Sequence, residues 1–194
     1  GNTGEILVIL LAPLFGLPIP LLAIHILWIN LVTDGLPGLA LAFEPPEANI
    51  MKRLPRKVNA SIFSGGIAIH ILWVGLLTGL VTLGAQAWAI HNNNPNWQTM
   101  AFSVLCFSQL GHVMAIRSDF NSVFKIGLFS NKPMLLAVTI MVILQFAIIY
   151  IPFFNQIFKT KPLSFEELLT TFVFSTIVFI AVELEKYLKF KVRQ

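Results

Sequence analysis

The sequence has few charged residues and a single cysteine. Only 11% of its 194 residues are Asp, Glu, Lys or Arg, whereas an ordinary soluble domain carries about 25%. Together with 56% hydrophobic residues and a mean hydropathy of +0.80, this excludes a typical soluble domain and indicates an integral membrane protein. The lone Cys106 excludes an intrachain disulfide and a cysteine-based metal cluster, and we interpret it as a small core residue.

Catalytic motifs are also lacking. The sequence contains no Walker A loop and no nucleophile constellation, so we expect no catalytic site within these residues. It begins without the basic region of a cleavable signal peptide. The net charge of +4 does not indicate nucleic acid, because the basic residues lie between apolar runs rather than in one patch. We therefore expect a lipid bilayer, and no nucleic acid, among the partners.

Six apolar segments predict an all-α, polytopic transmembrane helix bundle. The first, residues 5–16, would form only about 18 Å of helix, roughly half a bilayer. The five longer segments are residues 20–43, 61–90, 98–116, 133–153 and 166–187. We therefore expect five complete transmembrane helices plus the second half of one more at the N-terminus. Residues 1–194 would form a single membrane domain, as a fragment that starts inside a helix.

Glycines recur along the third segment. They are Gly65, Gly66, Gly75, Gly79 and Gly84. Small residues at intervals allow transmembrane helices to approach each other closely. We expect a tight helix contact along this segment.

The basic residues are distributed unevenly between the connections. Because segments alternate sides, the connections at 44–60 and 117–132 share a side with the C-terminal tail. That side holds eleven of the 13 Lys and Arg residues, and the other side holds Lys159 and Lys161. The positive-inside rule then predicts a multi-pass protein of the cell membrane with a cytoplasmic C-terminus.

The second segment carries polar residues at membrane depth. Asn30, Thr33 and Asp34 share one helical face. Gly35 and Pro37 follow, and proline removes a backbone donor, so the helix should loosen beside these polar residues. An ionisable residue inside a membrane is costly, and oxygen ligands with a negative charge suit a dehydrated hard cation. We interpret this face as an ion site; the alternative is that it supplies hydrogen bonds between helices.

Other polar residues have simpler interpretations. Three histidines are scattered along the sequence without metal-ligand spacing: His25, His70 and His91. We expect packing or interfacial roles for them. Near the end of the last segment, Glu183 and Glu185 are expected to pair with Lys186 or Lys189.

Two stretches of the sequence carry a family resemblance. Residues 30–38 read Asn-Leu-Val-Thr-Asp-Gly-Leu-Pro-Gly, followed by Phe-Glu-Pro-Pro-Glu at 43–47 and Ile-Met-Lys-Arg-Leu-Pro-Arg at 50–56. This resembles the sixth transmembrane helix and following loop of type II P-type cation-transporting ATPases, above all the sarco/endoplasmic reticulum-type calcium pumps and their bacterial relatives. Asn-Thr-Gly-Glu at residues 2–5 resembles the ion-binding stretch of that family's fifth helix. The resemblance implies the last six of ten transmembrane helices, the fifth cut in half.

The resemblance also implies a set of metal ligands. They are Asn2, Glu5, Asn30, Thr33, Asp34 and Gln109. In this family Asp34 is shared by two sites, and Asn30 belongs to the one completed by the fourth helix, which this chain does not contain. Calcium pumps have an acid where this chain has Gln109, so that position keeps an oxygen but loses a charge. We expect the site with Glu5 to be weak or to serve counter-transported protons, unless Gln109 and His112 only pack and hydrogen-bond.

The function implied by the resemblance is the ion-binding part of an ATP-driven calcium pump, a translocase that works by alternating access. Calcium is the expected transported substrate. The phosphorylation motif Asp-Lys-Thr-Gly-Thr does not occur in the sequence. Mg-ATP is therefore expected only in cytoplasmic domains of the same polypeptide, which, with the upstream transmembrane helices, are the expected partners. Three alternatives stay open: a pump for Mn, Na or H; a non-transporting scaffold module; and a carrier or channel unrelated to ATP.

Overall fold

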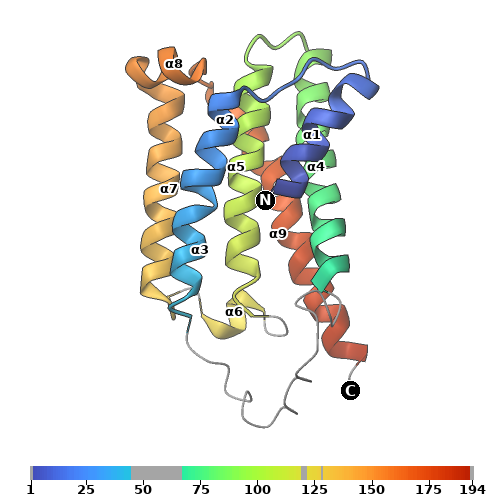
Figure 1. Ribbon diagram of the computed structural model, residues 1–194, viewed down its shortest axis with the longest axis vertical. Coiled ribbons are helices and arrows are strands. Elements are labelled where there is room, and N and C mark those ends of the chain that lie inside the picture. The colour runs from blue at the N-terminus through green and yellow to red at the C-terminus, as the bar shows by residue number, and fades with distance from the viewer. Residues whose placement is uncertain (1, 45–66, 119–121, 128, 193–194) are drawn as a thin grey trace.

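Long helices run up and down through the computed structural model, which describes residues 2–44, 67–118, 122–127 and 129–192 (Figure 1). Residues 45–66 lie outside this description. They include most of the predicted polar connection, the family motif at residues 50–56 and the start of the third segment. The elements are α1 (Asn2–Leu14), α2 (Ala23–Trp28), η1 (Ile29–Thr33), α3 (Gly35–Leu41), α4 (Ile67–His91), α5 (Trp97–Ala115), α6 (Val123–Ile126), α7 (Lys132–Tyr150), α8 (Pro152–Phe158) and α9 (Phe165–Val192).

The predicted all-α class is confirmed. Each of the six apolar segments coincides with a helix, and the second is a string of three helical pieces, α2, η1 and α3. Two short helices were not expected from hydropathy. Pro152 starts α8 directly after α7, where its missing N–H costs nothing, and the Ser122 hydroxyl accepts a hydrogen bond at the start of α6.

Within the described residues, four stretches are long and apolar enough to cross a membrane, whereas five complete spans were expected. They are Ala23–Leu41, Ile67–His91, Lys132–Tyr150 and Phe165–Leu188. The fifth expected span, α5, has 19 residues but is less apolar, because it carries Ser103, Ser108 and Gln109. These side chains are buried between helices, so the lower hydropathy of α5 reflects its central position.

The bundle is organised around α5, which lies between the other long helices (Figure 1). It packs against α4, α7 and α9 and also contacts η1. All residues from 99 to 110 are buried. Large apolar side chains point outward from the surrounding helices, such as Leu72 of α4 and Ile143 of α7, which are 64% and 61% exposed. Apolar surfaces of this extent are typical of helices that face lipid.

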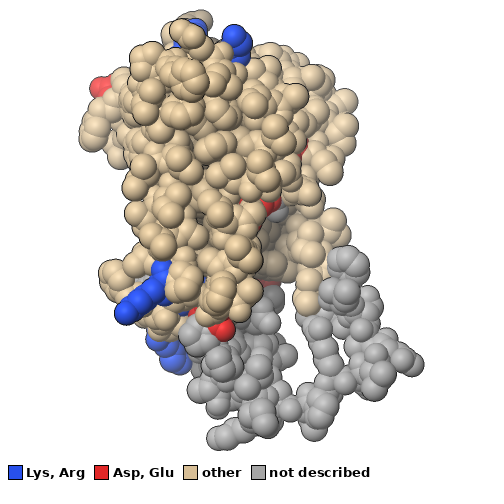
Figure 2. All heavy atoms as spheres, turned by 60° about the vertical axis from the view of Figure 1, so that its left-hand side comes forward, with Lys and Arg blue, Asp and Glu red and all other residues tan. Residues whose placement is uncertain are grey.

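The basic side chains lie where a membrane bundle would place them, away from its middle. On the face that Figure 2 shows, Lys and Arg lie towards the two ends, with a broad band between them that lacks basic side chains. A band of this kind is typical of helical membrane proteins.

Glycines bring α1 and α4 into close contact, as the glycine pattern predicts. A Cβ atom added to Gly75 would lie 2.5 Å from Cγ2 and 2.6 Å from Cβ of Thr3. One added to Gly79 would lie 3.2 Å from Cβ of Leu7, and one added to Gly4 would lie 3.3 Å from Thr78. The position of α1 therefore depends on the absence of side chains at these points.

We predict that Gly75→Ala in the full-length protein lowers its thermal stability. The new methyl group must push Thr3 and α1 away, and overpacking of this kind costs about 1–3 kcal/mol. Gly84→Ala is the matched control on the same helix, because its Cβ would lie 3.8 Å from Phe174, an ordinary contact. The measurement is the melting temperature in detergent. Equal melting temperatures for the two variants would show that the α1–α4 contact is not tight.

Candidate functional site

The helix that carries the polar face widens into a π-helical turn at Ile29–Thr33. The Asp34 N–H donates to the carbonyl of Ile29 at 2.8 Å, five residues back, instead of to Asn30. Pro37 lacks the N–H that would donate to the carbonyl of Thr33 in an α-helix. The predicted loosening beside the polar residues is thus confirmed, as a wide turn rather than a break. Turns of this kind are frequent at functional sites.

Glu5 of α1 is the centre of a hydrogen-bond network that joins three helices. Its side chain is buried, with 3% exposed. The Asn30 amide donates from Nδ2 to Oε2 of Glu5 at 3.0 Å, and the Gln109 amide donates from Nε2 to Oε1 at 3.4 Å. Asn30 also donates to the carbonyl of Ile26 at 2.9 Å, which fixes its side chain along the helix. Each carboxylate oxygen of Glu5 therefore receives one amide hydrogen.

Thr33 and Asp34 complete the polar group. Thr33 is 2% exposed, and its hydroxyl points at the sulfur of Cys106, 4.0 Å away. Asp34 is half-buried and lies near enough to Glu5 for the two carboxylates to interact electrostatically. Cys106, which the sequence presents as a plain core residue, is thus buried directly beneath the polar face.

The two remaining predicted site residues behave differently. Asn2 is exposed at the start of α1 and is outside the network that joins Glu5, Asn30 and Gln109. Gln109 is in the network, yet its carbonyl oxygen is buried and has no hydrogen-bond partner among the described residues. A buried acceptor without a partner costs about 1–3 kcal/mol. That oxygen is therefore available to a water molecule or a cation.

The donor set determines which ions suit this site. Carboxylate, amide and hydroxyl oxygens are ligands for hard cations such as Ca²⁺, and two nearby carboxylates repel each other unless a positive charge lies between them. Across the described parts of the chain, no group of three or more His, Cys, Asp and Glu side chains could hold a metal ion. The oxygen donors themselves, two carboxylates with amide and hydroxyl groups, favour a hard cation over zinc or copper.

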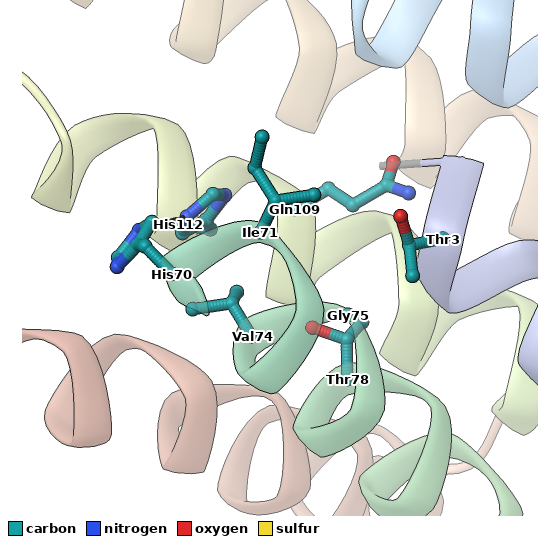
Figure 3. A pocket seen from close by; sticks show the side chains of 8 residues that line it. All are labelled: Thr3, His70, Ile71, Val74, Gly75, Thr78, Gln109 and His112. Carbon is teal, nitrogen blue, oxygen red and sulfur yellow. Dashed lines mark hydrogen bonds between the residues drawn. The ribbon is translucent and has the colours of Figure 1, made fainter. Parts of the chain in front are cut away.

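A cavity of about 70 Å³ borders the site between α1, α4 and α5. It is lined by Thr3, His70, Ile71, Val74, Gly75, Thr78, Gln109 and His112 (Figure 3). The Gln109 amide points towards Thr3, while His70 and His112 lie together on the other side (Figure 3). A water molecule needs roughly 10–15 Å³ measured in this way, so the cavity has room for several.

An ion pair anchors the far end of the helix that carries the site. Arg117, whose side chain is fully buried, donates from Nε to Oε2 of Glu44 at 2.9 Å and from Nη2 to Oε1 at 2.8 Å. Asn131 donates to Oε2 of Glu44 at 2.7 Å and caps α7. Burial opposes ionisation of Glu44, but the hydrogen bonds from Arg117 and Asn131 outweigh it and lower the pKa of Glu44. The sequence reveals Arg117 only as one of several basic loop residues, so this link was not anticipated.

We predict that Glu44→Gln destabilises the full-length protein at pH 7 by about 1–3 kcal/mol, because it removes the negative charge that pairs with the buried Arg117 guanidinium. The pKa of Glu44 is lower in the folded protein than its ordinary value of 4.5. The pair therefore stabilises the fold above that value, and its contribution is lost as the pH falls through the lowered pKa.

The measurement is the melting temperature of parent and variant from pH 7 down to below pH 4. The difference should be largest at pH 7 and should shrink at acid pH. Glu166→Gln, which alters an exposed carboxylate, is the control and should change little. A difference for Glu44→Gln that does not vary with pH would contradict the assigned ion pair.

Comparison with known proteins places these features in context. Residues 18–188 match the family described as cation transporting ATPase, C-terminus. The chain is 42% identical over 166 residues to a calcium-transporting ATPase of Bacillus subtilis (strain 168), covering 84% of this chain and 18% of that protein. It is 39% identical over 184 residues to calcium-transporting ATPase 1 of Bacillus cereus (strain ATCC 10987 / NRS 248), covering 86% and 21%. It is 35% identical over 188 residues to calcium-transporting ATPase 1 of Saccharomyces cerevisiae, covering 95% and 20%. The chain thus spans about a fifth of the length of these relatives.

Proposed function

The chain belongs to the cation-transporting ATPase family, whose C-terminal region it matches, and we propose on that premise that it is the ion-binding part of the membrane domain of an ATP-driven calcium pump. The observation that carries the proposal is the convergence of Glu5, Asn30 and Gln109 beside the π-helical turn that ends at Thr33 and is followed by Asp34. The relatives named calcium-transporting ATPases make calcium the favoured substrate.

The hydrogen bonds suggest how the side chains receive the ion. Asn30 and Gln109 each turn an NH₂ group towards Glu5, which leaves their carbonyl oxygens to face elsewhere. In this arrangement the amide hydrogens partly neutralise the Glu5 carboxylate. A calcium ion would take over that role, with Glu5 and Asp34 supplying charge and Thr33 a hydroxyl oxygen. Gln109 contributes no charge, so the site that includes it should bind more weakly than one with an acid there.

Asn2 is part of the proposed ligand set, but the structure shows no hydrogen bond between it and the other members, all of which are described residues. Its side chain is exposed, whereas Glu5, three residues later, is buried. The proposed role of Asn2 therefore rests on the resemblance to the family and not on a contact in the structure. We propose Glu5, Asn30, Thr33 and Asp34 as the principal ligands, with Asn2 and Gln109 as the peripheral members.

The rest of the pump would supply the energy. We propose that Mg-ATP binds to cytoplasmic domains of the same polypeptide, and that their phosphorylation drives alternating access by moving the helices. The close α1–α4 contact and the Glu44–Arg117 pair would transmit such movement to the π-helical turn between them. In this proposal the protein is multi-pass in the cell membrane, with its C-terminus in the cytoplasm.

We predict that Asp34→Asn in the full-length pump lowers calcium affinity by about tenfold or more, equivalent to at least 1.4 kcal/mol. The change keeps the shape of the side chain but removes the charge that both implied sites share. Calcium-dependent phosphorylation from ATP should disappear, while phosphorylation from inorganic phosphate, which needs no bound calcium, should persist.

Equilibrium binding of radioactive calcium and the two phosphorylation assays measure these effects. The retained reaction with phosphate shows that the variant is folded. Glu166→Gln should behave as the parent. Unchanged calcium binding by Asp34→Asn would refute the ligand role of Asp34, and transport of a different cation by the parent would refute the choice of substrate.

A further inference from the structure

Two histidines from different helices face each other at the side of the cavity away from the Gln109 amide (Figure 3). His70 lies near the start of α4 and His112 near the end of α5. Their Nε2 atoms are 3.4 Å apart. On the other side of its ring, His70 is hydrogen-bonded from Nδ1 to Oε2 of Glu185 in α9, at 2.7 Å. The expected pairing of an acid with Lys186 is confirmed for Glu183, whose Oε1 lies 2.6 Å from Nζ of Lys186. The contact of Glu185 with His70 was not anticipated.

The separation of the two nitrogens matches a tetrahedral metal site. Zinc binds imidazole nitrogens at about 2.0–2.1 Å, so two histidines on one tetrahedral ion have their nitrogens about 3.3–3.4 Å apart. The Nε2 atoms of His70 and His112 are already at this distance. The ring centroids are 5.7 Å apart, so the two nitrogens point at each other, and both rings would have to turn for their lone pairs to meet at one ion.

Glu185 orients the ring of His70. A carboxylate accepts a hydrogen bond, so its contact at 2.7 Å requires a proton on Nδ1 of His70. In the neutral ring the lone pair is then on Nε2, which faces His112. A carboxylate behind a histidine in this way is the usual arrangement at zinc sites, where it fixes the ring and makes the nitrogen more basic.

The cavity supplies space for the remaining ligands. Both histidines line it, and it has room for several water molecules. The side chain of His70 is 22% exposed, so an ion can reach it. The protein would provide two direct ligands.

We propose that His70 and His112 bind a divalent transition metal such as Zn²⁺, with Glu185 orienting His70 and water completing the coordination. Nitrogen ligands select such ions over Ca²⁺, which prefers oxygen. The site is separate from the oxygen ligands around Glu5. An ion there joins α4 to α5 directly and to α9 through Glu185, so it should stabilise this end of the bundle.

The first test is zinc binding by the full-length protein, measured by calorimetry with saturating Ca²⁺ and Mg²⁺ to occupy oxygen sites. We expect His70→Gln and His112→Gln each to lose the same single equivalent of bound Zn²⁺, and the double variant to lose no more. Glu185→Gln should weaken that equivalent by about 10–100-fold. His91→Gln, at the opposite end of α4 and exposed, is the matched control and should bind as the parent does.

Two further measurements separate binding from folding. Zn²⁺ should raise the melting temperature of the parent and of His91→Gln but not that of His112→Gln. Cu²⁺ bound to the parent at the same equivalent should show coupling to two nitrogens by electron paramagnetic resonance, a result that needs no variant. Equal zinc binding by the parent, His70→Gln and His112→Gln would overturn the proposal, as would a copper spectrum with oxygen ligands only.

Discussion

The buried carboxylate of Glu5 is the interaction on which the candidate site depends. Placing a charged or polar group away from water is unfavourable unless its hydrogen bonds are replaced. Here the replacement comes from Asn30 and Gln109, which lie 25 and 104 residues further along the chain. The three helices that carry these side chains must therefore keep a fixed relation to one another. A change that moves any one of them removes a partner from Glu5.

The surrounding structure keeps these helices in place by three different means. Gly75 lets α1 approach α4 closely enough for Glu5 to reach its partners. The π-helical turn presents Asn30 and Thr33 on the face that meets α1 and α5. The bidentate pair between Glu44 and Arg117 fixes the other end of the same helix to the loop after α5. Apolar residues around the polar group, such as Val8 and Leu105, are fully buried and limit access of water.

Much of this could be predicted from the sequence, because hydropathy and helical spacing are local properties. They gave the positions of the six helical segments, the shared face of Asn30, Thr33 and Asp34, and the loosening before Pro37. The resemblance to the ATPase family was correct, and it pointed to Glu5 and Gln109, whose side chains do meet. Their role as metal ligands stays a prediction.

The features that the sequence did not reveal depend on contacts between distant residues. His70 and Glu185 are 115 residues apart and Glu44 and Arg117 are 73 apart, so only the packing of the helices brings them together. The polar character of α5 hid its central place in the bundle, because hydropathy cannot distinguish a buried polar contact from exposure to water.

The central claim is that a cation binds among the oxygen atoms next to the π-helical turn. Anomalous diffraction from crystals of the full-length protein, grown with calcium, tests this directly. The account predicts a calcium peak about 2.3–2.6 Å from oxygens of Asp34 and of at least one of Glu5, Asn30 and Thr33. Calcium bound elsewhere in the membrane domain, with no peak at this turn, would contradict it.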